Sequence, residues 1–140
     1  MSGVGGTVGG LNVEQQEDAG KRALNEHGVF SEYVPMKIKI EGAKPHPSPL
    51  VESTAMASVE PVDVTYKPHI PLDIIKTGYP SIAQLEQIVY AGQAHQKMLP
   101  NGQRQGYAIG DGTGVGKGIE GSGIIVDNWN QGRRKHLYIT

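Results

Sequence analysis

Two stretches of this 140-residue chain have clear periodic patterns of hydrophobic residues. In residues 33–40, apolar side chains alternate with polar ones, which is the period of a half-buried strand. Pro35 favours an edge position for that strand, because proline cannot donate a ladder hydrogen bond. In residues 81–98, apolar residues recur at helical spacing after a capping-box pattern formed by Ser81 and Gln84. We therefore expect an edge strand, followed later in the chain by one amphipathic helix.

In the last third of the chain, short apolar runs flank a glycine-rich loop. Residues 106–110 predict a short strand that ends at the loop, and residues 117–130 predict a helix that begins in it. Residues 136–140 predict a second strand. A strand, a helix and a second strand in this order form a βαβ unit, with the glycine-rich loop at its first turn. The expected fold class is therefore α/β.

The remaining segments contain few residues that could form a core. Five glycines in the first ten residues, followed by a polar run, predict a flexible leader with a helical turn or two at 21–27. Prolines interrupt residues 41–80 and predict an extended segment, in which residues 62–66 could add a strand. The chain thus divides into three expected regions: a flexible glycine-rich leader at 1–30, an extended segment at 31–80, and the region of the glycine-rich loop at 81–140.

Composition excludes several classes of protein. With 20 glycines, 9 prolines and 37% hydrophobic residues, the chain is expected to hold one modest ordered domain. The absence of cysteine excludes disulfides, cysteine-ligated zinc and thiol catalysis. The sequence has neither a secretory signal pattern nor an apolar run of the roughly 18 residues that a membrane span needs. A net charge of −1 gives no overall signal for nucleic acid. We therefore expect a cytoplasmic protein that does not contact membranes.

The strongest chemical signal is the glycine-rich loop at 110–118, Gly-Asp-Gly-Thr-Gly-Val-Gly-Lys-Gly. Glycines let backbone N–H groups turn toward an anion, the following helix presents its positive end, and Lys117 adds a cation. In the phosphate-loop pattern G-x-x-x-x-G-K-[ST], Gly116 and Lys117 match, whereas Asp111 and Gly118 replace the first and last fixed residues. Gly118 also removes the hydroxyl that usually binds Mg²⁺. The loop therefore predicts a phosphate site with an altered metal position.

Two other interpretations of this loop are weaker. Gly116, Gly118 and Gly121 fit the dinucleotide-binding pattern G-x-G-x-x-G. That fold needs a carboxylate for the ribose at the end of the second strand, and residues 136–140 contain none. The loop could also be a surface turn without a ligand. The strand and helix patterns on its two sides favour the phosphate loop.

The loop and its surroundings resemble one family of helicase-like ATPases. The residues that carry the resemblance are the segment from Ile109 to Gly118, Gly123-Ile124-Ile125 and Gly132-Arg133-Arg134-Lys135. Upstream they are His46-Pro47, Leu50-Val51-Glu52-Ser53, Met56-Ala57, Val64-Thr65-Tyr66 and Gln84-Leu85-Glu86. These motifs cover about residues 33–140 and resemble the strawberry notch family of superfamily 2 helicase-like ATPases.

The resemblance implies a fold, a ligand and the residues that bind it. Residues 81–140 would be a truncated P-loop helicase region, an incomplete RecA-like βαβ unit preceded by the extended arm and the amphipathic helix. Lys117 would hold the β- and γ-phosphates of ATP, and Gln84 would read adenine, although its place in the capping box gives it a structural role as well. ATP, with Mg²⁺, would be bound by Asp111, Gly112, Thr113, Gly114, Val115, Gly116, Lys117, Gly118 and Gln84. No catalytic residue and no protein ligand to a metal is expected.

Departures from the family pattern predict low activity. Ile119 stands where the family usually has arginine, and Glu120-Gly121-Ser122 replaces a more apolar run and adds a negative charge near the phosphates. The sequence ends before later helicase motifs, so the acidic magnesium-binding motif and the second lobe are expected to be missing. We therefore expect an N-terminal helicase fragment that binds ATP weakly and cannot hydrolyse it alone. The alternatives are a non-catalytic adaptor, or half of a split ATPase completed by a second polypeptide.

Other residues give weaker signals. Phage and bacterial members of the family often lie in long polypeptides beside DNA methyltransferase modules, which implies a DNA substrate for the complete helicase and a phage or bacterial source. The basic run at 133–136 could contact nucleic acid but is more typical of a solvated turn. The five histidines are scattered and do not predict a metal site. Glu52 has no assignable catalytic partner.

Overall fold

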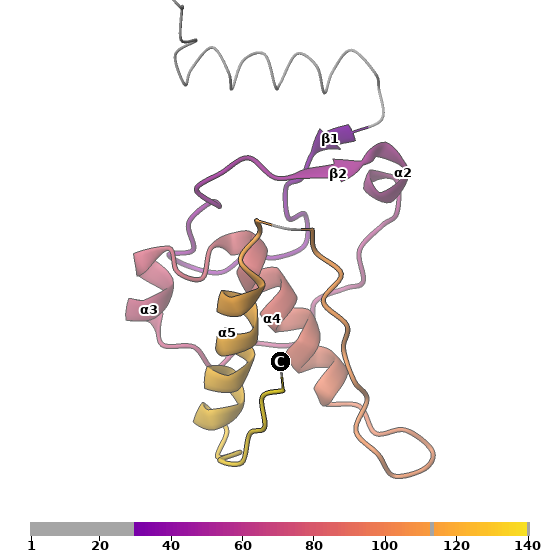
Figure 1. Cartoon of the computed structure of the whole chain (residues 1–140), viewed down its shortest axis with the longest axis vertical. Coiled ribbons are helices and arrows are strands. Elements are labelled where there is room, and N and C mark those ends of the chain that lie inside the picture. Colours follow the sequence, from indigo (N-terminus) through magenta and orange to yellow (C-terminus); the bar gives the residue numbers. More distant parts are fainter. Residues whose placement is uncertain (1–29, 113, 140) are drawn as a thin grey trace, which may run out of the picture. The chain divides into compact units, whose positions relative to one another are not determined.

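The computed structural model describes residues 30–112 and 114–139 (Figure 1). Most of the predicted leader at 1–30, and the helical turn predicted at 21–27, lie outside the described residues. The chain divides into two units, which we describe separately. The described part of the smaller unit comprises residues 30–32 and Val51–Val59, and that of the larger unit comprises Tyr33–Leu50, residues 60–112 and residues 114–139.

The smaller unit is a short antiparallel strand pair with one helical turn. Strand β1 (Phe30–Glu32) pairs with β2 (Val51–Ser53), so that Phe30 lies opposite Ser53. Helix α2 (Thr54–Ala57) begins directly after β2, and the Ser53 side chain caps it by accepting a 3.2 Å hydrogen bond from the Met56 N–H. Because α2 has no buried residue, this unit contributes little to a core.

The larger unit contains three helices joined by extended chain: α3 (Leu72–Thr77), α4 (Ile82–His95) and α5 (Lys117–Asn130). Helix α4 confirms the amphipathic helix predicted at 81–98, although it ends at His95. The Gln84 half of the predicted capping box is formed, because the Ser81 N–H donates to Gln84 Oε1 at 2.9 Å, whereas the buried Ser81 hydroxyl has no hydrogen-bond partner among the described residues. Helix α5 has the bounds predicted at 117–130.

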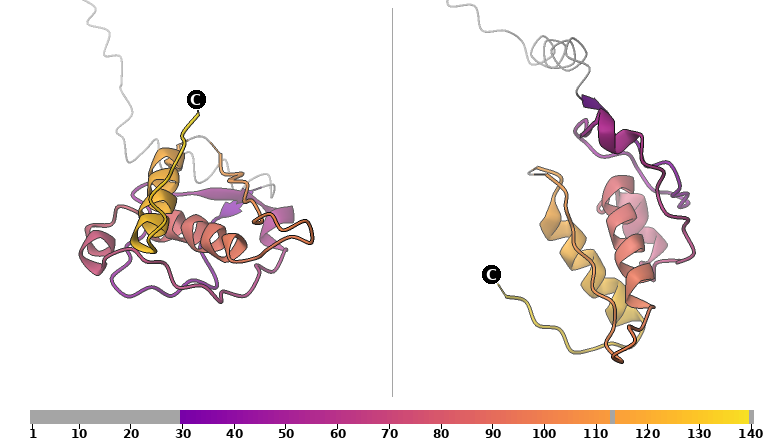
Figure 2. Two further views of the ribbon diagram at one scale, coloured as in Figure 1. Left: turned by 90° about the horizontal axis from the view of Figure 1, so that it is seen from below. Right: turned by 90° about the vertical axis from the view of Figure 1, so that its right-hand side faces the viewer.

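Helices α4 and α5 lie side by side and run in the same direction (Figures 1 and 2). Near their N-terminal ends, Gln84 Nε2 donates to the Val115 carbonyl at 2.7 Å. At their C-terminal ends, Gln96 Nε2 donates to Gln131 Oε1 at 3.4 Å. Close approach depends on Gly123 of α5, where an added Cβ would lie 2.3 Å from Ile88 Cδ1. The pair therefore has one end at the glycine-rich loop and the other at the chain that follows each helix.

Residues of the three helices and of the extended chain form a small apolar core. Ile70, Ile75, Leu85 and Ile88 form its buried cluster, against which Ile40, Ala43 and Ile124 pack. The proline-rich segment, which was predicted to be extended, thus supplies core residues, and one of them, Ile75, lies in helix α3. Its backbone is also held directly, since the Ile82 N–H donates to the Lys44 carbonyl at 2.7 Å.

The prediction of a strand at 33–40 is wrong, because no strand forms at these residues. Pairing occurs just before it, in β1, and residues 33–40 have no strand partner. Val34 and Met36 are exposed, whereas Ile38 is buried. The segment is held by side chains instead, because Lys37 Nζ contacts Glu60 at 3.0 Å and Asp63 at 2.7 Å. Residues 62–66 form no strand either.

The two strands of the predicted βαβ unit are also not formed within residues 30–112 and 114–139. Residues 106–110 and 136–139 are irregular, and only the intervening helix is formed. Leu137, Tyr138 and Ile139 are 86%, 76% and 83% exposed. Parallel sheets normally have both faces covered, and the described residues provide no parallel partner strand for either segment. Helices together with one small sheet are compatible with the α/β class, and the described residues do not form the two strands predicted for an incomplete RecA-like unit.

Candidate functional site

The glycine-rich loop turns sharply into α5. Gly114 and Gly116 have φ angles of 90° and 91°, a left-handed conformation that favours glycine. Gly116 is the N-cap of α5, so Lys117 is the first residue of the helix. The predicted glycine, lysine and helix thus occur together, and Thr113 is the one predicted loop residue outside the described part.

The Val115 carbonyl connects the loop to two distant segments. It accepts the 2.7 Å hydrogen bond from Gln84 Nε2, and His46 Nε2 lies 3.2 Å from the same oxygen. Gln84 therefore serves both the capping box of α4 and the loop, and its adenine-binding role stays a prediction. Sequence reasoning did not assign His46 to this site, because nothing in its spacing indicated a contact with a residue 69 positions away.

Asp111 is held by a second chain of contacts from α4. Gln87 Nε2 donates to Asp111 Oδ1 at 3.3 Å, and the Tyr107 hydroxyl donates to Gln87 Oε1 at 2.7 Å. Burial, followed by the charge of Asp111, raises the pKa of Tyr107 to about 12. Tyr107 is therefore a neutral hydrogen-bond donor at neutral pH, and the first position of the loop is tied to the middle of α4.

The outer side of the loop is open to an approaching ligand. An added Cβ at Gly112, Gly114 or Gly118 would meet no atom within 4 Å, and the Lys117 residue is exposed. The first turn of α5 leaves N–H groups without helical partners and carries a partial positive charge. The glycines, the helix start and Lys117 therefore fit an anion such as the phosphate chain of a nucleotide.

A buried acid lies one turn after the loop. Glu120 is fully buried, and within the described part neither of its carboxylate oxygens has a hydrogen-bond partner. Burial is the main cause that raises its pKa to about 7, Asp111 raises it further, and Lys117 opposes the change. Near neutral pH this acid is thus partly protonated, which reduces the negative charge that the sequence predicted near the phosphates.

Replacing Glu120 with glutamine should stabilise the chain at alkaline pH. Because the folded-state pKa lies above the unfolded value of 4.5, the folded chain holds the proton longer. The wild type should therefore lose stability as pH rises from about 4.5 through about 7. Glu120→Gln should remove this loss.

Urea denaturation at about pH 5 and about pH 8 measures the effect. The free energy of unfolding of the variant should exceed that of the wild type mainly at the higher pH, where the wild-type Glu120 is ionised. Equal differences at the two pH values would contradict a buried, proton-holding Glu120.

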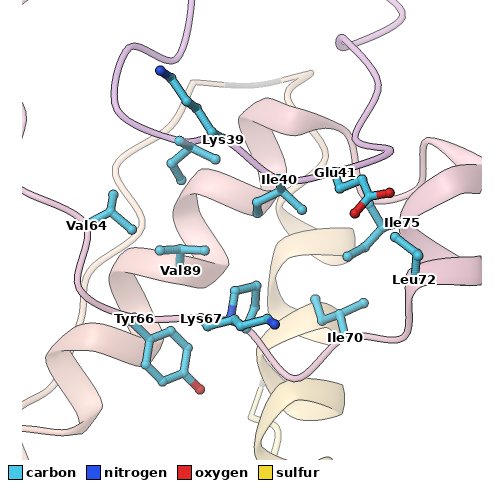
Figure 3. Close-up of a pocket in the computed structure, with 12 residues that line it drawn as sticks. Lys39, Ile40, Glu41, Val64, Tyr66, Lys67, Ile70, Leu72, Ile75 and Val89 are labelled. Atoms are coloured by element: carbon cyan, nitrogen blue, oxygen red, sulfur yellow. The ribbon is translucent and has the colours of Figure 1, made fainter.

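A pocket lies away from the loop (Figure 3). It has a volume of about 530 Å³, and extended chain, α3 and α4 line it, with Ile40, Val64, Tyr66, Ile70 and Val89 among its walls. None of the predicted nucleotide-binding residues belongs to this lining. The candidate phosphate site is therefore an exposed loop.

The described residues show neither a cluster of metal ligands nor a membrane-spanning helix. They contain no group of three or more histidine, cysteine or acidic side chains that could hold a metal ion. No helix in the same part of the chain is long and apolar enough to cross a membrane. Glu52 lies in β2, in the smaller unit.

Comparison with known proteins agrees with the loop geometry. Residues 45–140 match the family model described as P-loop containing NTP hydrolase pore-1, which places the chain among the P-loop NTPases. The chain is 47% identical over 131 residues to Protein strawberry notch of Drosophila melanogaster, an alignment that covers 91% of this chain and 8% of the relative. No solved structure matches.

Two further relatives extend the match. Protein strawberry notch homolog 1 of Gallus gallus is 42% identical over 91% of this chain and 10% of its own length. Protein FORGETTER 1 of Arabidopsis thaliana is 40% identical over 93% of this chain and 10% of its own. The chain belongs to the strawberry notch family, as the resemblance predicted, and it spans about a tenth of the length of these relatives. Because they come from animals and a plant, a phage or bacterial source stays a prediction.

Proposed function

We propose that this chain carries the ATP phosphate-binding loop of a strawberry notch-type, helicase-like ATPase. The observation that carries the proposal is the pair of left-handed glycines placed directly before an exposed lysine at the start of α5. Backbone N–H groups of residues 111–118 and the Lys117 ammonium would bind the phosphates. The bond from Gln84 to the Val115 carbonyl supports this role, because it occupies an oxygen that would otherwise repel an anion.

Magnesium would enter this site with the nucleotide. Gly118 offers no hydroxyl, and Asp111 and Glu120 are the acids near the loop. A Mg²⁺ ion in such a site would be held mainly by phosphate oxygens and water, where it would neutralise phosphate charge. Metal and nucleotide should therefore bind together, and weakly.

We further propose that the chain does not hydrolyse ATP by itself. Hydrolysis in P-loop enzymes needs a group that orients water, an acidic metal ligand and cationic groups around the γ-phosphate. The chain spans about a tenth of its relatives' length, and a second polypeptide or further sequence would supply these groups. The exposed Leu137, Tyr138 and Ile139 support the need for further sequence or a second polypeptide. They have the composition of a β-strand but are not paired with another strand among the described residues.

A titration of the full chain with ATP, in the presence and absence of Mg²⁺, tests the proposal. Calorimetry should show saturable binding, and Lys117→Ala should weaken it by about tenfold to a hundredfold because a charged contact with phosphate is lost. The control Lys39→Ala removes an exposed lysine outside the loop and should bind as the wild type does.

The same titration separates the alternatives. Saturable binding without phosphate release supports a nucleotide-binding fragment, and phosphate release by the purified chain would contradict its inactivity. An absence of binding, with Lys117→Ala and the wild type indistinguishable, would contradict the phosphate site and favour an adaptor. DNA as the substrate of the complete protein follows from the helicase-like family and needs the complete protein for its test.

A further inference from the structure

One serine in the chain has the sequence context of a phosphorylation site. Ser48 is the only serine or threonine that is followed by proline, and it lies in the run Pro45-His46-Pro47-Ser48-Pro49. Proline fixes its own φ angle and biases the residue before it toward extended backbone, so this run is extended before a partner binds it. Protein kinases bind the segment around their target serine in an extended form, and preorganisation lowers the entropy cost of that binding. The run therefore fits a proline-directed protein kinase.

The structure leaves Ser48 accessible to an enzyme. The residue is exposed, and residues 44–50 belong to no helix or strand. Within the described part of the chain its hydroxyl has no hydrogen-bond partner, whereas the Ser53 hydroxyl caps α2 and Ser81 is fully buried. Modification of Ser48 therefore needs no unfolding of the chain.

His46 connects this serine to the glycine-rich loop, within the larger unit. Its Nδ1 atom lies 2.9 Å from the Ser48 carbonyl oxygen and 3.3 Å from the Ser48 backbone nitrogen. The other ring nitrogen, Nε2, lies 3.2 Å from the Val115 carbonyl oxygen, between the two left-handed glycines of the loop. One imidazole ring thus joins the backbone of Ser48 to that of the loop, a span within the Debye length of about 10 Å at 0.1 M salt.

A phosphate on Ser48 would place an anion beside the loop that is proposed to bind the phosphates of ATP. Phosphorylation adds about −1.5 to −2 charges at pH 7. Residues 45–51 contain no lysine or arginine that would neutralise this charge. Because repulsion between anions extends over about one Debye length, part of the added charge would act on a bound nucleotide. ATP should therefore bind the phosphorylated chain more weakly than the unmodified chain.

We propose that Ser48 is a phosphorylation site for a proline-directed protein kinase and that its phosphate weakens nucleotide binding by the glycine-rich loop. In the transfer, Ser48 Oγ forms a bond to the γ-phosphorus of the ATP held by the kinase, and the bond from that phosphorus to the bridging oxygen of ADP breaks. The serine proton passes to the catalytic aspartate of the kinase, and ADP leaves. Phosphorylation itself is independent of the loop, whereas its effect on affinity rests on the proposed function.

Incubation of the full chain with a purified mitogen-activated protein kinase and ATP, followed by mass spectrometry of the digested chain, tests the site. One phosphate per chain should appear on Ser48, and Ser48→Ala should remove it. Pro49→Ala keeps the hydroxyl and should lose most of the incorporation. Ser58→Ala removes an exposed serine that is followed by valine and should be phosphorylated as the wild type is. No incorporation, or equal incorporation in Ser48→Ala, would overturn the site.

The coupling between Ser48 and the loop is measured without nucleotide. After the kinase and its ATP are removed, the backbone amides of Val115 and Gly116 in the ¹⁵N-labelled chain should differ in chemical shift between the phosphorylated and unmodified forms. In His46→Ala, which keeps Ser48 and loses the ring, this difference should shrink. Amides that are identical in the two forms, or a difference that is equally large in His46→Ala, would overturn the coupling.

Calorimetric titration with ATP measures the effect on affinity. The phosphorylated chain should bind ATP about threefold to tenfold more weakly than the unmodified chain, and the two affinities should converge at about 1 M salt, where the Debye length is about 3 Å. Equal affinities at low salt would overturn the proposed effect. If neither form binds ATP, the proposed function fails instead, and the phosphate on Ser48 together with the amide shifts still decides between modification coupled to the loop and its absence.

Discussion

Asp127→Ala should lower the free energy of unfolding by about 2–4 kcal/mol, the size expected when a buried charged acceptor is lost. The Asp127 carboxylate is almost fully buried and accepts from the Tyr66 hydroxyl at 2.7 Å and from the His69 N–H at 2.6 Å. Gln131 Nε2 lies 3.1 Å from it and also donates to the Tyr66 hydroxyl at 2.7 Å. Removing the carboxylate takes this acceptor from the Tyr66 hydroxyl and the His69 N–H, and leaves Asn130 Nδ2, which donates to the His69 carbonyl at 2.6 Å, as a remaining bond between α5 and the extended segment.

Urea denaturation measures this loss, with Asp127→Asn as the matched control. Asparagine keeps the shape of the aspartate side chain and one acceptor oxygen. Asp127→Asn should therefore lower the free energy of unfolding clearly less than Asp127→Ala does. The ring of Tyr66 gives the cluster a second structural role, because an added Cβ at Gly92 would lie 2.2 Å from it. An Asp127→Ala variant within about 0.5 kcal/mol of the wild type would show that the cluster does not hold this segment.

Gly116→Ala should damage both the loop and its proposed affinity for ATP. The φ angle of 91° costs an L-residue roughly 1–2 kcal/mol. The added Cβ would also lie 2.5 Å from Gln84 Nε2, the atom that holds the Val115 carbonyl. The Gln84 side chain or the loop must therefore shift, which disturbs the bond to the Val115 carbonyl, and we expect a loss of stability of about 2 kcal/mol together with at least tenfold weaker ATP binding.

Gly118→Ala provides the control for this substitution, two residues further along. Gly118 is helical, and an added Cβ there would meet nothing within 4 Å. Alanine should therefore stabilise α5 by about 1 kcal/mol without opening the loop. Thermal unfolding and ATP titration of both variants check the pair. Equal effects at the two positions would contradict the left-handed turn at Gly116.

The helices were predictable because their signals are local. Helix α4 has a capping box and a continuous apolar face, and α5 follows the left-handed glycine that starts it. Helix α3 had local signals too, Pro71 at its start and Gly78 at its end with a φ of 87°, but the many prolines around it predicted extended chain. Strands depend on partners elsewhere, so alternation at 33–40 and apolar runs at 106–110 and 136–140 were insufficient.

The candidate site also has features that the sequence predicts and features that depend on distant contacts. The positions of Gly114, Gly116 and Lys117 at the start of a helix follow from the motif itself. The anchoring of the loop by His46, and the burial of Glu120 without a hydrogen-bond partner, depend on contacts between distant segments. Helical periodicity could show that Glu120 shares the inner face of α5, but it could not show how completely the neighbouring segments cover it.

The central claim is that backbone N–H groups of the glycine-rich loop bind the phosphates of ATP. Backbone amide resonances of the ¹⁵N-labelled full chain, followed by NMR during titration with ATP and Mg²⁺, test it most directly. The account predicts that the amides of Gly114, Gly116, Lys117 and Gly118 shift together to saturation, and that inorganic triphosphate shifts the same set. Loop amides that stay in place, with either no shifts or shifts confined to the lining of the pocket near Val64 and Val89, would contradict the claim.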